Sequence, residues 1–152
     1  MARKITISAI MAVALLAAAW GVLYVRNATP VVPTIGTEMA AEVDKPWVVK
    51  LHAQWCPVCM LTKGVWAKIE ETYEDRVRFV VFDFTNEATT NASRVEAERL
   101  GLSSVFDEAG YATGPIIVLD GRTKEIRAWI NGSLDVATYR AAVDEALESA
   151  GG

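Results

Sequence analysis

The stretch Trp55-Cys56-Pro57-Val58-Cys59 holds both cysteines of this 152-residue chain. An apolar run at residues 47–51 precedes it, and apolar residues with helical spacing come after it. A predicted strand thus delivers a C-x-x-C to the first turn of a helix, a context typical of a redox-active dithiol. The unpaired N–H groups at a helix N-terminus lower the pKa of a thiol beside them. We therefore predict that Cys56 is an exposed nucleophile and that Cys59 is its resolving partner.

The composition indicates an acidic chain of ordinary domain size. Its formal net charge of −4 argues against nucleic acid as a partner. Because both cysteines belong to one motif, none remains for a structural disulfide, and the core has to depend on packing. The chain contains no internal repeats and no low-complexity tracts. A single folded domain is therefore expected.

An uncharged apolar segment, residues 5–25, comes after a short lead that contains Arg3 and Lys4. A run of about 18 or more apolar residues predicts a transmembrane helix, and the basic lead stays on the cytoplasmic side. A cleaved signal peptide is the alternative, with Ala17-Ala18-Ala19 as its cleavage site. We favour an uncleaved single-pass anchor over residues 1–25, because the apolar run continues past that site. Under either interpretation the chain after residue 25 is exported.

The exported part divides into a linker and one domain. Residues 26–36 include Pro30, Pro33 and Gly36 and have no clear period, which predicts a linker. Residues 37–152 then alternate strand-like and helix-like patterns. In the first half of the domain we expect a short helix over residues 38–43, a strand over 47–53, a helix over 60–73, a strand over 77–84 and a helix over 86–100 that ends at Gly101. In the second half we expect a short helical turn between 103 and 110, a strand over 116–119, a returning strand over 125–130 and a helix over 135–147. This order predicts an α/β fold.

The order of these elements and motifs resembles the thioredoxin superfamily over roughly residues 43–150. Trp-Cys-x-x-Cys lies at a strand-to-helix junction, Gly114-Pro115 precedes an apolar strand, and Asp120-Gly121 and Asn131-Gly132 come next in the superfamily's order. Residues 81–86 are similar to the branch that includes the periplasmic domain of membrane disulfide reductases. The resemblance implies a thioredoxin-like fold, a central mixed sheet flanked by helices, here preceded by the transmembrane helix.

The resemblance also implies thiol–disulfide exchange, with the redox-active Cys56–Cys59 pair in place of a cofactor. Cys56 attacks a substrate disulfide as the thiolate, and Cys59 resolves the mixed disulfide. Gly114-Pro115 resembles the superfamily's cis-proline, which implies that Pro115 lies beside the cysteines and leaves the Gly114 backbone free to pair with an extended substrate.

Aromatic and proline neighbours complete the expected substrate surface. Trp55 is interpreted as a cover over the cysteines that shapes docking. Pro57 suits the first helical position, where its missing N–H has no cost. Trp66 and Trp129 are expected in the core instead.

Lys50 stands where the superfamily usually carries a buried acid that takes the proton of the second cysteine. A lysine there stabilises a thiolate electrostatically. Alternatively its side chain extends to the surface without a catalytic role, the interpretation that we favour. The proton of Cys59 would then pass to water, or to Glu38, Glu42 or Asp83.

His52, the only histidine, stands where the superfamily usually has an aromatic residue beside the site. A packing substitute is favoured over a redox-tuning role. With Met60 and the two thiolates it also offers soft ligands to copper(I), so copper transfer is an alternative function. Zinc normally takes four ligands, which this chain does not offer, and no resident metal is expected.

The dipeptide Pro57-Val58 contains no histidine to stabilise the thiolate, and this favours a disulfide reductase over a thiol oxidase. Lys50 would favour the opposite direction. An exported reductase needs a membrane electron donor of the disulfide-reductase transporter type, because the extracytoplasmic space is oxidising. We therefore expect a single-pass protein of the cell membrane whose periplasmic domain acts on protein disulfides.

Overall fold

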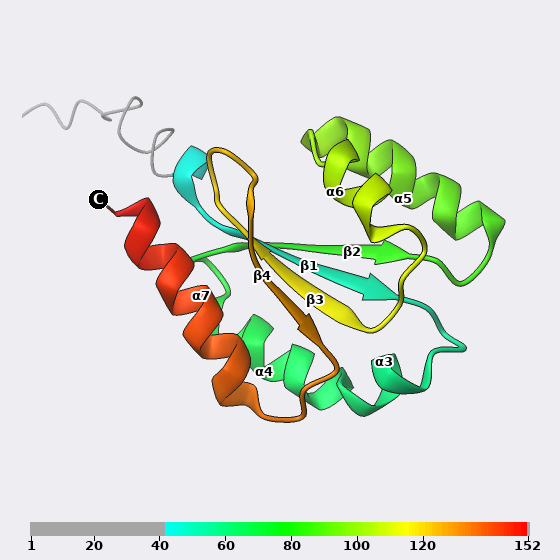
Figure 1. The fold of residues 1–152 in the computed structure, drawn as a ribbon, viewed down its shortest axis with the longest axis horizontal. Coiled ribbons are helices and arrows are strands. Elements are labelled where there is room, and N and C mark those ends of the chain that lie inside the picture. Colours follow the sequence, from blue (N-terminus) through cyan, green and yellow to red (C-terminus); the bar gives the residue numbers. More distant parts are fainter. Residues whose placement is uncertain (1–41, 152) are drawn as a thin grey trace, which may run out of the picture. The chain divides into compact units, whose positions relative to one another are not determined.

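The computed structural model describes residues 42–151. They form a four-stranded mixed sheet with helices on both faces (Figure 1), which confirms the predicted α/β architecture. No helix within residues 42–151 combines the length and the hydropathy that a membrane crossing requires. The predicted anchor over residues 1–25 and the linker over 26–36 lie outside the described residues, as does most of the short helix expected over 38–43.

The sheet has the strand order β2-β1-β3-β4. Strand β1 pairs in parallel with β2 and antiparallel with β3, and β3 pairs antiparallel with β4. The parallel pair requires a crossover, which the helices after the cysteines supply. In chain order the elements are β1 (Trp47–His52), α3 (Pro57–Leu61), α4 (Lys63–Tyr73), β2 (Arg78–Asp83), α5 (Glu87–Leu100), α6 (Ser103–Ala109), β3 (Pro115–Leu119), β4 (Ile126–Asn131) and α7 (Val136–Ala150).

Two apolar cores lie on opposite faces of the sheet. Helices α5 and α6 cover one face, and α3, α4 and α7 cover the other (Figure 1). Successive side chains of a strand point to opposite faces, so Val49 and Leu51 belong to the first core and Val48 to the second. The central strands β1 and β3 are buried on both faces, which explains their nearly continuous apolar sequences.

The helix predicted over residues 60–73 is two helices. Helix α3 ends and α4 begins at Thr62, whose hydroxyl donates to the Val58 carbonyl over 2.8 Å. A threonine that bonds the preceding turn in this way often bends a helix. Gly64 lies in the first turn of α4.

Other helix ends agree with the predicted signals. At the start of α5, Asn86 and Thr89 form a capping box, and Gly101 ends the helix in the left-handed region with φ 67°. Helix α7 starts after Asp135, whose carboxylate accepts from the Ala137 amide over 2.9 Å. It continues to Ala150, three residues beyond the predicted end at Leu147.

The two tryptophans expected in the core differ. Trp66 is 7% exposed and meets the Phe79 ring edge-on at 5.4 Å, as predicted. Trp129 is only partly buried at the margin of the core under α5 and α6. Its indole N–H donates to the side chain of Asn131 over 3.1 Å, so this tryptophan belongs to the edge strand rather than to the centre.

Candidate active site

Both cysteines lie just beyond the carboxyl end of β1, at the first turn of α3. Cys56 is the N-cap of α3, and its sulfur accepts a hydrogen bond from the Cys59 amide over 3.3 Å. Pro57 occupies the first helical position, as predicted. The Cys59 thiol donates to the Leu51 carbonyl over 3.5 Å. The structure describes both cysteines in the free, reduced state.

The prediction that Cys56 is exposed is wrong, because Cys56 is 3% exposed and Cys59 2%. The covering residues come from the loop before β3. A Cβ built on Gly114 would lie 3.8 Å from the Cys56 sulfur, and Thr113 hydrogen-bonds to that sulfur. Cys56 is therefore closely packed against the loop before β3.

The two thiols are shifted in opposite directions. Burial raises the pKa of Cys56, but the neighbouring Cys59 thiol, Thr113 and the amides of Cys59 and Val58 outweigh it, so the pKa lies below its ordinary value. Burial, together with the neighbouring Cys56, raises the pKa of Cys59. Of the two thiols, Cys56 therefore ionises more readily, and Cys59 keeps its proton to a higher pH.

The segment Gly114-Pro115 lies beside the cysteines, as the resemblance implied, but its geometry corrects two expectations. None of the peptide bonds in residues 42–151 is cis, so the bond before Pro115 is trans. Gly114 makes the turn into β3 through its φ of 108°, a conformation that glycine adopts readily. Its N–H donates to the Leu51 carbonyl over 2.8 Å, and this backbone donor is therefore occupied rather than free for a substrate.

Lys50 does not extend to the surface, and that prediction is wrong. The side chain is 7% exposed, because β1 is a central strand, and its ammonium lies 5.2 Å from the centre of the Trp66 ring. Burial lowers the pKa of Lys50, against the attraction of Cys59, Glu70 and Cys56. In return its charge lowers the pKa of Cys59. Lys50 is thus a buried cation that acts electrostatically on the resolving thiol.

The described carboxylates considered as acceptors for the Cys59 proton have other partners. Glu42 forms an ion pair with Lys45 over 2.6 Å and precedes β1, so a strand of about 20 Å separates it from the cysteines. Asp83 accepts from the Thr85 amide over 2.8 Å. Neither belongs to the groups that act most strongly on the pKa of Cys59. Glu38 lies outside the described residues.

His52 and Trp55 flank the motif. His52 pairs in register with Asp83 of β2 and is half-buried. It is not among the strongest influences on the pKa of either cysteine, which favours the packing interpretation. Trp55 is 62% exposed, and its indole N–H donates to the Thr85 carbonyl over 3.1 Å.

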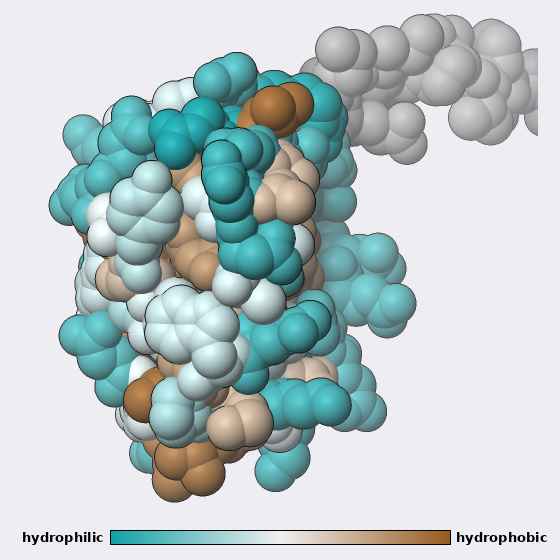
Figure 2. All heavy atoms as spheres, turned by 90° about the vertical axis from the view of Figure 1, so that its right-hand side faces the viewer, coloured by the Kyte–Doolittle hydropathy of each residue, from teal (hydrophilic) through white to brown (hydrophobic). Residues whose placement is uncertain are grey.

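Helix α3 presents an apolar surface beside the two cysteines. Figure 2 shows this side of the molecule, with hydrophobic side chains gathered at its lower part among hydrophilic ones. Met60 and Leu61 are 63% and 67% exposed. Met60 therefore faces solvent, and among residues 42–151 no three His, Cys, Asp or Glu side chains are close enough together to hold a metal ion.

Thr113 was not found from the sequence, and Gly132 was found only as part of the Asn131-Gly132 motif and not as a residue of the site. Thr113 bonds the Cys56 sulfur, and only its place before Gly-Pro could have indicated it. Gly132 has φ 61°, and a Cβ there would lie 2.7 Å from Cγ1 of Val58. The loop before α7 therefore packs directly on the dipeptide between the cysteines, and it needs glycine to do so.

Comparison with known proteins agrees with this geometry. The family model described as Thioredoxin matches residues 32–99, which include the C-x-x-C and the strands on either side of it. Over these residues the chain is similar to the thioredoxin superfamily.

Curated relatives match the chain over part of their length. The thioredoxin-like protein HCF164 of rice chloroplasts is 40% identical over 60 residues, which are 40% of this chain and 21% of that protein. The thiol:disulfide interchange protein TxlA of Synechococcus elongatus is 32% identical over 50 residues, 33% of this chain and 26% of that protein. The chain thus spans about a fifth to a quarter of these two relatives. Thioredoxin O2 from Arabidopsis thaliana, a solved structure, has 20% identity over 73% of this chain and 86% of its own, with a TM-score of 0.43.

Proposed function

We propose that the chain is a thiol–disulfide oxidoreductase that reduces protein disulfides at Cys56 and Cys59. The observation that carries the proposal is the placement of the pair: Cys56 caps α3, and its sulfur accepts a hydrogen bond from the Cys59 amide over 3.3 Å. In this placement the pKa values of the two thiols shift in opposite directions. A nucleophile has to be ionised, whereas the resolving thiol has to wait with its proton until the mixed disulfide has formed. The pair provides this division of roles.

The exchange proceeds in two displacements. The Cys56 thiolate attacks one sulfur of the substrate disulfide, forms a mixed disulfide and releases the other substrate sulfur as a thiolate, which takes up a proton. Cys59 then loses its proton and attacks the Cys56 sulfur, which closes the Cys56–Cys59 disulfide and releases the second substrate thiol. Two electrons pass from the pair to the substrate, and the buried charge of Lys50 favours the ionisation of Cys59.

The direction of reduction is supported by the residues between the cysteines. Pro57 and Val58 offer no side-chain donor to the Cys56 thiolate, so the reduced form gains less than in a strong oxidant that has such a donor. Lys50 works against this preference. Among the relatives, TxlA bears the name thiol:disulfide interchange protein, which is neutral as to direction.

We further propose that the domain is exported and is held at the membrane by residues 1–25. The basic lead with Arg3 and Lys4 and the uncharged apolar segment support this placement. In an oxidising periplasm the spent disulfide needs a membrane electron donor of the disulfide-reductase transporter type. Cell fractionation tests the anchor: a soluble chain that begins at Trp20 would contradict it.

Insulin reduction tests the activity. The full chain should precipitate insulin chains in the presence of dithiothreitol, and Cys56→Ser should abolish this. Cys59→Ser should instead accumulate mixed disulfides, and its remaining thiol should alkylate with an apparent pKa below the usual value of about 8.5. Absence of wild-type activity together with stoichiometric copper(I) binding would replace the proposal by metal transfer. Function that survives in the Cys56→Ala/Cys59→Ala variant would indicate a redox-silent adaptor.

A further inference from the structure

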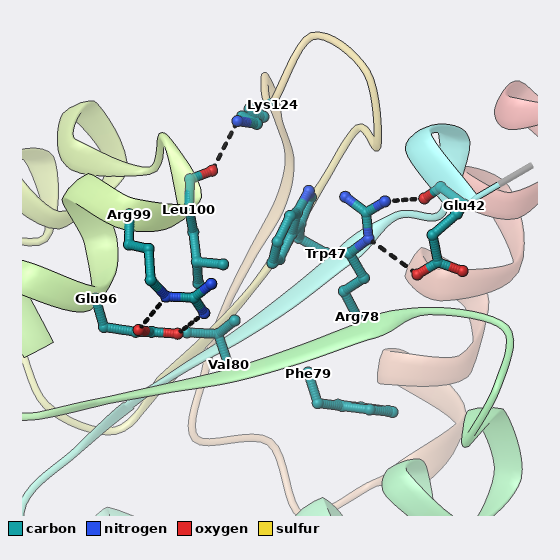
Figure 3. Close-up of a pocket in the computed structure, with 9 residues that line it drawn as sticks. All are labelled: Glu42, Trp47, Arg78, Phe79, Val80, Glu96, Arg99, Leu100 and Lys124. Carbon is teal, nitrogen blue, oxygen red and sulfur yellow. Dashed lines mark hydrogen bonds and ion pairs between the residues drawn. The ribbon is translucent and has the colours of Figure 1, made fainter. Parts of the chain in front are cut away.

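A groove lies at the end of β1 opposite to the cysteines (Figure 3). Its volume is about 530 Å³, and it is bordered by β2, by the end of α5, by Lys124 of the β3–β4 turn and by Glu42. Trp47, the first residue of β1, lies at its floor with Val80 and Leu100. Because β1 spans about 20 Å, the groove does not overlap the dithiol site.

Trp47 leaves a polar atom unsatisfied in this groove. The residue is 6% exposed, and its indole nitrogen is buried without a hydrogen-bond partner among residues 42–151. In Figure 3 this nitrogen is at the end of the indole that lies between Lys124 and the Arg78 guanidinium. Native proteins rarely leave a buried N–H without an acceptor. The atom therefore indicates a ligand that brings an acceptor.

Cationic groups surround the indole. Arg78 lies over the Trp47 ring, 4.7 Å from its centre, and bonds to both the carbonyl and the carboxylate of Glu42. Lys124 gives one donor to the Leu100 carbonyl over 2.8 Å. At the rim, Arg99 pairs with Glu96. The groove thus has one more cation than it has carboxylates, on a chain whose net charge is −4.

The groove also lies along an unpaired strand edge of the described sheet, since β2 is its outermost strand. Two backbone N–H groups point toward β1: that of Arg78 donates to the Pro46 carbonyl over 2.8 Å, and that of Phe84 donates to the His52 carbonyl over 2.7 Å. By alternation, Phe79 and Val81 direct their backbone N–H and C=O groups outward. An extended polypeptide can add to such an edge as a further strand. Alternate side chains of that strand would then extend over the groove.

We propose that this groove binds an extended acidic segment of a partner polypeptide, which pairs with the outer edge of β2 and places a carboxylate on the Trp47 indole N–H and the Arg78 guanidinium. The floor formed by Val80 and Leu100 accepts an apolar side chain next to that carboxylate. The site is a docking surface separate from the dithiol, so a partner can be held there while exchange proceeds at the other end of the sheet.

Peptide binding to the reduced full chain tests the proposal. The probe is a fluorescein-labelled ten-residue peptide that alternates Glu and Val, and the comparison peptide alternates Gln and Val. Fluorescence anisotropy should show binding of the Glu peptide that weakens with salt, and weaker binding of the Gln peptide. Trp47→Phe keeps the ring and removes the donor, so the Kd for the Glu peptide should rise about tenfold, as expected for a hydrogen bond to a charged group.

Arg78→Gln should weaken the binding of the Glu peptide. Thermal unfolding shows whether Trp47→Phe folds, and Arg78→Gln replaces it in the test if it does not. Arg140→Gln, an exposed arginine on α7, is the matched control and should bind as wild type does. Equal binding of the two peptides, or an unchanged Kd in Trp47→Phe, would overturn the proposal. The proposal would also be overturned if neither peptide binds and the Phe79 and Val81 amides exchange hydrogen slowly, because another part of this chain would then occupy the edge of β2.

Discussion

Replacing Lys50 by methionine should slow the resolving step of exchange and leave the first step unchanged. Lys50 is buried beside the site and lowers the pKa of Cys59, whereas it is not among the strongest influences on Cys56. Methionine keeps most of the volume next to Trp66 and removes the charge. The Cys59 thiol should therefore become harder to ionise, and the mixed disulfide on Cys56 should persist longer.

The magnitude can be worked from ordinary electrostatics. A nearby opposite charge moves a pKa by about 1 to 3 units. Burial and the hydrogen bond to Cys56 affect Cys59 more strongly than Lys50 does, so we take the lower end, about 1 unit or about 1.4 kcal/mol. The thiolate fraction of Cys59 then falls about tenfold, while the higher basicity restores part of the nucleophilicity, with a Brønsted coefficient of about 0.4–0.5. The resolving step should slow about three- to fourfold.

Stopped-flow reaction of the reduced chain with 5,5′-dithiobis(2-nitrobenzoate) separates the two steps. Attack by Cys56 releases one coloured thiolate, and attack by Cys59 on the mixed disulfide releases the second. Lys50→Met should slow only the second phase. Lys68→Met, which removes a charge from the exposed face of α4, should leave both phases unchanged. A second phase in Lys50→Met that is as fast as in the wild type would refute the electrostatic role of Lys50.

Three further predictions concern stability. Gly132→Ala should lower the free energy of unfolding by about 1–2 kcal/mol in chemical denaturation, because the φ of Gly132 is 61° and a Cβ there would lie 2.7 Å from the Val58 side chain. Gly64→Ala, where a Cβ would have nothing within 4 Å, should instead raise the free energy of unfolding by about 0.5–1 kcal/mol. Backbone amides of the β3–β4 turn hold the pKa of Asp120 below its usual range. The stabilisation that Asp120 provides is therefore present above about pH 4 and is lost as the pH falls. The free energy of unfolding of Asp120→Ala, measured at decreasing pH, should not show that loss. Burial and a bond to a carboxylate raise the pKa of Tyr73 to about 12, so wild type, unlike Tyr73→Phe, should lose stability as the pH rises from about 10 to about 12.

Much of the fold could be predicted because local chemistry and tertiary packing agree in this chain. The Asn86 cap, the Gly101 stop and the apolar run of β3 each specify an element on their own. The break at Thr62 could not be predicted in the same way. Its hydroxyl bonds the Val58 carbonyl, and a threonine in a helical pattern is as compatible with a continuous helix as with a bend.

In the candidate site, too, the features set by neighbouring residues could be predicted, and those set by tertiary contacts could not. The C-x-x-C at a strand-to-helix junction was sufficient to place Cys56 at the N-cap and Cys59 one turn inside. Burial of Cys56 depends on Thr113 and Gly114, which the fold brings from a distant loop. Burial of Lys50 depends on neighbouring strands on both sides and on Trp66 over its end. Neither could be deduced from neighbours in the sequence.

The most direct test of the proposed reductase is the reduction potential of the Cys56–Cys59 pair, measured by equilibration of the full chain with glutathione or dithiothreitol buffers. A value near that of thioredoxin, about −270 mV, is predicted. A value near −120 mV, about that of a strong oxidant, would contradict the proposal. It would mean that the lowered pKa of Cys56 and the buried charge of Lys50 stabilise the reduced form enough to make the chain a thiol oxidase.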